Sequence, residues 1–266
     1  MGVLFVKKKA INFLYAVDCY LLYILSGIIA SVAVVAYYSV VAARDFGSFG
    51  ADMDANSFFE YIANVLSGKA SVVLLISYVL VLAATVVVFA VKRMRMMSYT
   101  GLSYCRPVSL VASVCLGVLL NLIVMHFVPE QSGGEAEFTL LLVLCIILGP
   151  IVEELMFRGI LLKMFGASVG IVFSVIITSA LFAVAHGGIV QIAYTFILGI
   201  VLGIVRYKST SLWNSIAVHV AFNLSGAFAT VFSFDFDSFE ILLILIAAVV
   251  LFVLSCTGGR KWRKSA

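Results

Sequence analysis

The chain has 266 residues, of which 64% are hydrophobic and 11% charged, and it carries a formal net charge of +4. Soluble domains contain about 25% charged residues, so this composition and the mean hydropathy of +1.21 exclude an ordinary soluble protein and predict a polytopic membrane protein. Nothing in the charge suggests nucleic-acid binding. The cysteines form no CxxC or other close pair, which argues against a disulfide framework and a thiolate metal site.

The N-terminal part of the chain predicts a retained helix. The lysines Lys7–Lys9 precede an apolar stretch that continues to about Ala42 without a convincing cleavage site, so we do not expect a cleaved signal peptide. This stretch is too long for one perpendicular crossing of a hydrocarbon core about 30 Å thick. We therefore expect a cytoplasmic or interfacial segment over residues 1–17 and a first transmembrane helix over 18–42.

Further apolar segments of membrane-spanning length follow in regular order. They cover residues 71–91, 108–128, 138–162, 168–187, 189–206, 211–232 and 239–256. The loop at about 43–70 contains a stretch, Ser57–Leu66, that suits a short helix. The predicted fold class is therefore all-α: a polytopic bundle of about eight transmembrane helices over residues 18–256, followed by a basic tail over 257–266.

The basic residues give this bundle an orientation. With the N-terminus in the cytoplasm and the segments alternating, every lysine and arginine except Arg44 and Lys69 falls on the cytoplasmic side or at its boundary. The outer segments hold most of the acidic residues instead. This is the positive-inside distribution of membrane proteins, and it predicts that the N-terminus and the C-terminus are both cytoplasmic.

Charged residues inside the segment 138–162 are the main clue to function. Glu153 and Glu154 are adjacent, and Arg158 follows Glu154 by one helical turn, so the latter two can pair on one face. Charges in hydrocarbon are costly unless they are paired or used. Glu154 and Arg158 could form a purely structural ion pair, whereas Glu153 has no partner nearby in sequence.

Two later segments add histidines at helical spacing. Phe182 precedes His186 by one turn, and His219 precedes Asn223 by one turn. Glu153, His186 and His219 could hold a divalent ion such as Zn²⁺ and activate a bound water. Without metal, a glutamate–histidine pair could activate water directly while the other histidine and Asn223 stabilise the oxyanion. The same polar groups could also only bridge helices by hydrogen bonds.

The depth of His186 is the weak point of such a site. Glu153 and His219 are expected near mid-membrane, but His186 is expected close to the outer face, because it ends its segment. The three can meet only if this helix starts deeper, tilts or belongs to a short hairpin. Gly187 and Gly188 would permit an early turn.

The order of these residues is specific. Glu153-Glu154-x-x-x-Arg158, then Phe182-x-x-x-His186, then His219-x-x-x-Asn223, resembles the motif series of the CAAX-processing and bacteriocin-processing family (CPBP, also called Abi), intramembrane proteases similar to the type II CAAX prenyl endopeptidases.

That resemblance implies an eight-helix fold with a protease core at about 138–232. It implies Glu153 as the principal catalytic carboxylate, with His186, His219 and Asn223 completing the site. Glu154 either holds Arg158 or acts as a second carboxylate, and Arg158 and Phe182 support the site. The implied substrate is a membrane-associated or lipidated protein or peptide, and the expected location is a prokaryotic plasma membrane.

Two other functions stay open. The same scaffold could serve as a non-catalytic bacteriocin-immunity or partner-binding protein. Glu153 and His219 could also form the proton relay of an ion-coupled transporter, although no internal repeat supports this. No HExxH, GxSG or phosphate-binding GxxxxGK[ST] sequence occurs, which disfavours zincins, rhomboid-like serine proteases and nucleotide-dependent enzymes.

Overall fold

The computed structural model describes residues 2–46, 55–67, 69–91, 93, 95–128, 140–229 and 236–257. Within these residues the regular secondary structure is entirely helical, which confirms the all-α prediction. The first half comprises α1 (Gly2–Phe46), α2 (Ala55–Ser67), α3 (Ala70–Val91), the short α4 (Met96–Thr100) and α5 (Pro107–Phe127). The second half comprises α6 (Leu140–Glu154), the π-helix η1 (Leu155–Leu161), α7 (Leu162–Val169), α8 (Ile171–Val184), α9 (Ile189–Ser209), α10 (Leu212–Ala229) and α11 (Ser238–Ser255).

Each apolar segment predicted from the sequence contains a helix, and α2 covers the short helix expected at Ser57–Leu66. Helix α1 runs without interruption through residue 17, so secondary structure does not mark the boundary expected between residues 1–17 and 18–42. The tail at 257–266 lies almost wholly outside the described residues.

Five of the described helices, namely α1, α3, α5, α9 and α11, are long and apolar enough to cross a membrane. The remaining predicted crossings fall on α6 with η1, on α8 and on α10. These are the segments that carry or adjoin the charged and polar residues singled out in the sequence. The helices α6, η1, α8 and α10 therefore carry the charged and polar residues expected at the candidate site.

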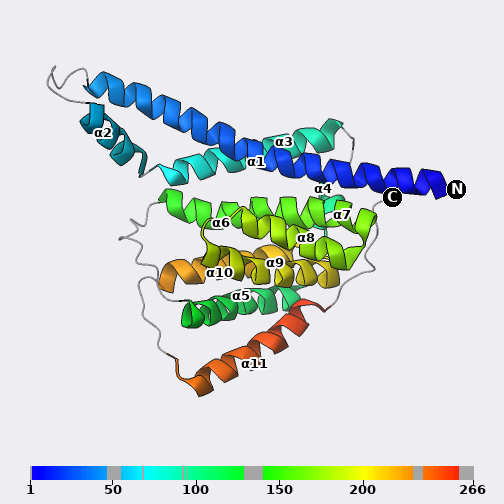
Figure 1. Cartoon of the computed structure of the whole chain (residues 1–266). Helices are drawn as coiled ribbons and strands as arrows, with labels where there is room; N and C mark the ends of the chain where they lie inside the picture. The colour runs from blue at the N-terminus through cyan, green and yellow to red at the C-terminus, as the bar shows by residue number, and fades with distance from the viewer. Residues whose placement is uncertain are drawn as a thin grey trace.

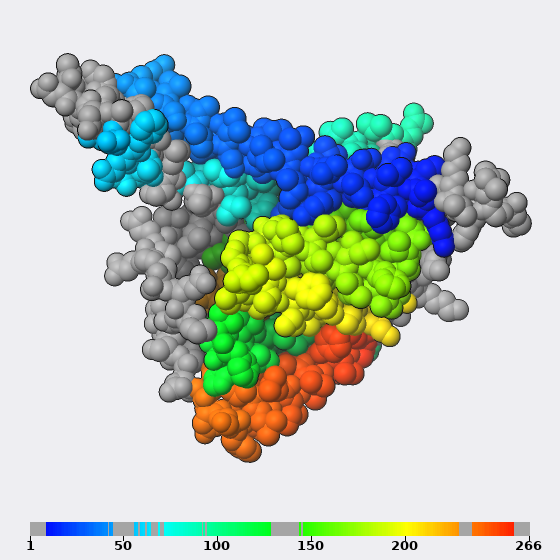
Figure 2. Space-filling model, in the orientation of Figure 1, coloured from blue at the N-terminus to red at the C-terminus, as the bar shows by residue number. Residues whose placement is uncertain are grey.

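The helices stack in layers (Figure 1). Helices α1 and α3 contact each other and form one end of the bundle, while α11 packs on α5 at the other end. Between them lie α6, η1 and α7, then α8 with α9, and α10, which contacts α5, α6 and α9. Figure 2 shows the same order on one face, from α1 (blue) through the α7–α9 region (yellow-green) to α11 (orange-red).

Exposure differs sharply between the outer and central helices. Large apolar side chains on the outer helices face outward, for example Val32 at 63% and Val249 at 63% exposure. By contrast, every residue of η1 is buried. Such an apolar exterior around a buried polar interior supports a multi-pass membrane protein.

The hairpin of α8 and α9 settles where His186 lies. Helix α8 ends at Val184, and the backbone of Gly188, with a φ of 75°, begins α9 almost at once. Such a φ is readily adopted only by glycine. His186 lies in the turn of this α8–α9 hairpin, one of the three arrangements considered from the sequence, and its depth in the membrane stays a prediction.

Candidate active site

The helix that carries the two glutamates changes from α-helical to π-helical geometry directly after Glu154. Pro150 lies inside α6 and cannot donate the backbone hydrogen bond that an α-helix requires there. Directly after Glu154 the chain continues as the π-helix η1, a form that is rare and often marks functional sites. Its residue Phe157 is fully buried in the main apolar core, together with Val152 and Leu161. The two glutamates thus sit at the junction between α6 and a rigidly packed segment.

The Glu154 carboxylate binds two side chains in the interior of the bundle. It is fully buried, and its Oε1 accepts hydrogen bonds from Arg158 Nη1 at 2.9 Å and from His219 Nδ1 at 3.1 Å. Arg158, also fully buried, donates from Nη2 to the Gly199 carbonyl on α9 at 3.2 Å. One ion pair therefore connects α6, η1, α9 and α10, which suits a buried charge that must be paired to be tolerated.

Glu153 points to different partners. Its Oε1 accepts a hydrogen bond from the Tyr78 hydroxyl on α3 at 2.8 Å. Its other oxygen, Oε2, faces Nε2 of His219 at 3.9 Å. The partners that the sequence around Glu153 lacks thus come from α3 and α10, and the two adjacent glutamates contact opposite nitrogens of one imidazole.

The hydrogen bonds fix the tautomers of both histidines. An ionised carboxylate only accepts, so Nδ1 of His219 carries the proton that is shared with Glu154. In His186, Nδ1 lies 2.8 Å from the Phe182 carbonyl, which also only accepts. In the neutral state each ring therefore has its lone pair on Nε2, and in His219 that lone pair is directed toward Glu153.

Phe182 joins these groups by its ring. The ring is fully buried and lies edge-to-face with His219 at a centroid distance of 5.5 Å and with His186 at 4.6 Å. The Arg158 guanidinium carbon lies 4.4 Å from the same centroid, which is a cation–π contact. Phe182 therefore packs against both histidines and against the cation that holds Glu154.

His186 and Asn223 lie at the edge of this arrangement. Both are only half-buried, His186 in the α8–α9 turn and Asn223 one turn after His219 on α10. Among the contacts of the described residues, none joins either side chain to Glu153. The structure thus brings Glu153, Glu154, Arg158, Phe182 and His219 together, with His186 stacked on Phe182.

The residues suggested for metal binding do not gather into a ligand set. Within the described parts of the chain, no three His, Cys, Asp or Glu side chains are grouped closely enough to hold an ion. Glu153 Oε2 and His219 Nε2 are two donors that face each other, but His186 does not complete the set. Zinc binding therefore stays a prediction.

Tyr78 was not anticipated from the sequence. The only available signal was a phenol hydroxyl in an otherwise apolar segment, where a buried tyrosine normally needs a hydrogen-bond partner. His126, by contrast, is exposed at the end of α5, stacked edge-to-face on Phe127, and stays apart from the glutamates.

Charged and titratable side chains at the centre of a membrane-type helix bundle mark a candidate functional site. Residues 135–225 match the family described as type II CAAX prenyl endopeptidase Rce1-like, which confirms the resemblance to the CAAX protease family seen in the sequence. Comparisons with curated proteins and with solved structures found no match.

Proposed function

We propose that the protein is an intramembrane endopeptidase that hydrolyses a peptide bond in a membrane-associated or lipidated protein or peptide. One observation carries this proposal: His219 lies between two carboxylates, with Nδ1 3.1 Å from Glu154 and Nε2 3.9 Å from Glu153. A buried imidazole oriented by one carboxylate and directed at another is suited to moving protons.

The two glutamates take different roles in this proposal. Glu154, neutralised by Arg158, holds His219 in one tautomer and one orientation, as the carboxylate of a hydrolytic triad does. Glu153 is the general base. This role is supported by Oε2, the oxygen that does not accept the Tyr78 hydrogen bond. It faces Nε2 of His219 at a distance that is too long for a direct hydrogen bond.

That spacing suits an attacking water. Two atoms 3.9 Å apart can both lie about 2.8 Å from one water oxygen when the angle at the water is about 90°. Glu153 accepts one proton as the oxygen attacks the scissile carbonyl carbon, while the His219 lone pair accepts a hydrogen bond from the second O–H. Glu153 then gives its proton to the amide nitrogen, the C–N bond breaks, and a carboxylic acid and an amine are released, the acid passing its remaining proton to the amine.

His186 and Asn223 are proposed to act on the carbonyl oxygen. Asn223 offers an amide N–H from the helix face that carries His219, and His186 lies against the Phe182 ring that also contacts His219. Removal of a hydrogen-bond donor to the developing oxyanion typically lowers kcat by a factor of about 10²–10³. Their partial exposure suits groups that complete their contacts only when substrate is bound.

The topology proposed is eight crossings with both termini in the cytoplasm of a prokaryotic cell. The first residues of α1 and the last residues of α11 lie on the same side of the bundle (Figure 1), as an even number of crossings requires. The positive-inside distribution of the basic residues supports a cytoplasmic location for that side.

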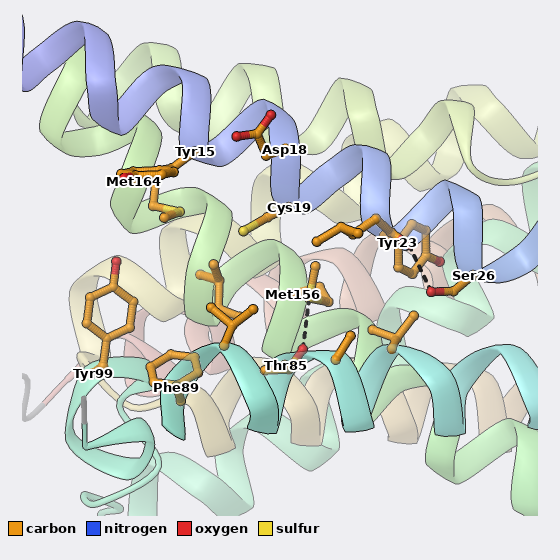
Figure 3. Close-up of a pocket in the computed structure, with 15 residues that line it drawn as sticks. Tyr15, Asp18, Cys19, Tyr23, Ser26, Thr85, Phe89, Tyr99, Met156 and Met164 are labelled. Atoms are coloured by element: carbon orange, nitrogen blue, oxygen red, sulfur yellow. Dashed lines mark hydrogen bonds between the residues drawn. The ribbon is translucent and has the colours of Figure 1, made fainter. Parts of the chain in front are cut away.

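An apolar cavity beside the glutamates supports a substrate with a hydrocarbon group. The cavity measures about 240 Å³ and is bounded by α1, α3 and η1 (Figure 3). Met156 and Ile160 of η1 form one wall, and Val81 and Thr85 of α3 form another. Val81 follows Tyr78 by less than one turn, so the cavity adjoins the helix face that contacts Glu153.

The test is cleavage by the purified full chain in liposomes, with quenched fluorescent peptides ending in a CAAX sequence, prenylated and unprenylated. Glu153→Gln should lower kcat by about 10²–10⁴, since it removes a general base. Glu60→Gln, the same change on an exposed residue of α2, is the matched control. Cleavage by Glu153→Gln at the wild-type rate would refute the proposal. Bacteriocin protection that survives the substitution would favour an immunity role instead.

A further inference from the structure

We infer that Tyr78 is a positioning residue for Glu153, setting which carboxylate oxygen faces His219. The inference rests on the proposed role of Glu153 as the base. It places a functional group on α3, far outside the segment 135–225 that matches the CAAX protease family. The candidate site is therefore incomplete within that segment.

The contact is buried and direct. Tyr78 and Glu153 are each only 7% exposed, and the hydroxyl donates to Oε1 at 2.8 Å. A glutamate carboxyl group turns easily about its last bond, with a broad and roughly two-fold preference. A hydrogen bond on Oε1 stops that rotation, and Oε2 is then left directed at Nε2 of His219.

Helix α6 provides a space for this tyrosine. A Cβ placed on Gly149 would lie 2.9 Å from the Tyr78 hydroxyl oxygen and 3.1 Å from its ring carbons. An alanine at this position, one turn before Glu153, would force the phenol ring to shift, so glycine allows the ring to lie against α6. The close approach of Tyr78 to Gly149 thus supports the same role as the hydrogen bond.

In a Tyr78 variant without the hydroxyl, Glu153 Oε1 loses this donor, and the carboxyl group can turn about its last bond. The other titratable groups near Glu153 are Tyr23 on α1, His219 on α10, and the Glu154–Arg158 pair. These groups are unchanged in a Tyr78 variant, so a difference from wild type reports on the hydroxyl.

The experiment compares Tyr78→Phe with Tyr20→Phe. Tyr20 also donates from its hydroxyl, but to the Leu181 carbonyl at 3.2 Å, so the control removes the same atom from a different bond. For Tyr78→Phe we expect kcat to fall about 5- to 50-fold with KM nearly unchanged. Gly149→Ala, which displaces the ring and keeps the hydroxyl, should give the same change.

A second readout does not require proteolysis. The infrared carboxyl band that disappears in Glu153→Gln identifies Glu153, and at fixed pH in liposomes this band should change position in Tyr78→Phe but not in Tyr20→Phe, because only the first variant removes the hydrogen bond to Oε1. An unshifted band in Tyr78→Phe overturns the inference, whether or not peptides are cleaved. Equal losses of kcat in both tyrosine variants without a band shift also overturn it, because the role would then be packing alone. Absence of cleavage by wild type, with the band shifted, would refute the proposed function and leave the positioning role supported.

Discussion

The Glu154–Arg158 pair gives the sharpest energetic prediction. Both side chains are fully buried, and Arg158 is held by three contacts: Glu154 at 2.9 Å, the Gly199 carbonyl at 3.2 Å and the Phe182 ring at 4.4 Å. Arg158→Met keeps much of the side-chain volume but leaves the Glu154 carboxylate without its cation. Breaking a buried pair in this way costs about 3–5 kcal/mol, equivalent to a factor of about 10²–10³ or more in the ratio of folded to unfolded protein.

The double variant Glu154→Gln with Arg158→Met tests the reason for that loss. It leaves no unpaired charge, so it should be more stable than Arg158→Met alone, with a coupling energy of at least 1 kcal/mol. The assay is reversible unfolding in mixed micelles, followed by circular dichroism, for wild type, both single variants and the double variant. Strictly additive losses, or an Arg158→Met variant within 1 kcal/mol of wild type, would refute the view that the pair is coupled and buried.

The remaining predictions use matched pairs of substitutions. Ala84→Phe fills the apolar cavity and should raise KM for a prenylated peptide several-fold, whereas Ala83→Phe, on the exposed face of the same helix, should not; equal KM values would exclude the cavity as the substrate's hydrocarbon site. Gly117→Ala brings a Cβ within 2.8 Å of Ala221 Cβ and should cost about 1–3 kcal/mol in unfolding assays. Gly166→Ala, with its nearest atom at 3.9 Å, should be neutral or slightly stabilising, and similar losses for the two variants would contradict the packing described. Asn223→Ala should lower kcat about 10²–10³-fold without loss of stability if it donates to the oxyanion, and an unchanged kcat would remove it from the mechanism.

The helices themselves were predictable because hydropathy alone locates apolar segments of membrane length. The pairing of Glu154 with Arg158 was also predictable, since one helical turn separates them and neither can remain unpaired in hydrocarbon. The π-helix after Glu154 was not predictable, because its hydropathy pattern is that of any buried helix.

Contacts between segments that are far apart in the chain could not be predicted from the sequence. Nothing about Tyr78 distinguishes it from other tyrosines in apolar helices until α3 packs against α6 and brings its hydroxyl to Glu153. The end of α8 at Val184, which places His186 in a turn, was likewise not predictable, because the sequence offered three arrangements without a means of choosing among them.

The length of α8 has a consequence for the lipid around it. At about 1.5 Å per residue, its 14 residues extend only about 21 Å, against about 30 Å for a hydrocarbon core. Under the proposed topology, this hydrophobic mismatch is met by local thinning of the bilayer, by a descent of headgroups beside the helix, or by both. Because His186 lies in the turn at the end of α8, such thinning would bring headgroup water closer to the glutamates without an aqueous channel through the whole membrane. The supply of water for hydrolysis would then depend on bilayer thickness, a property of the host membrane.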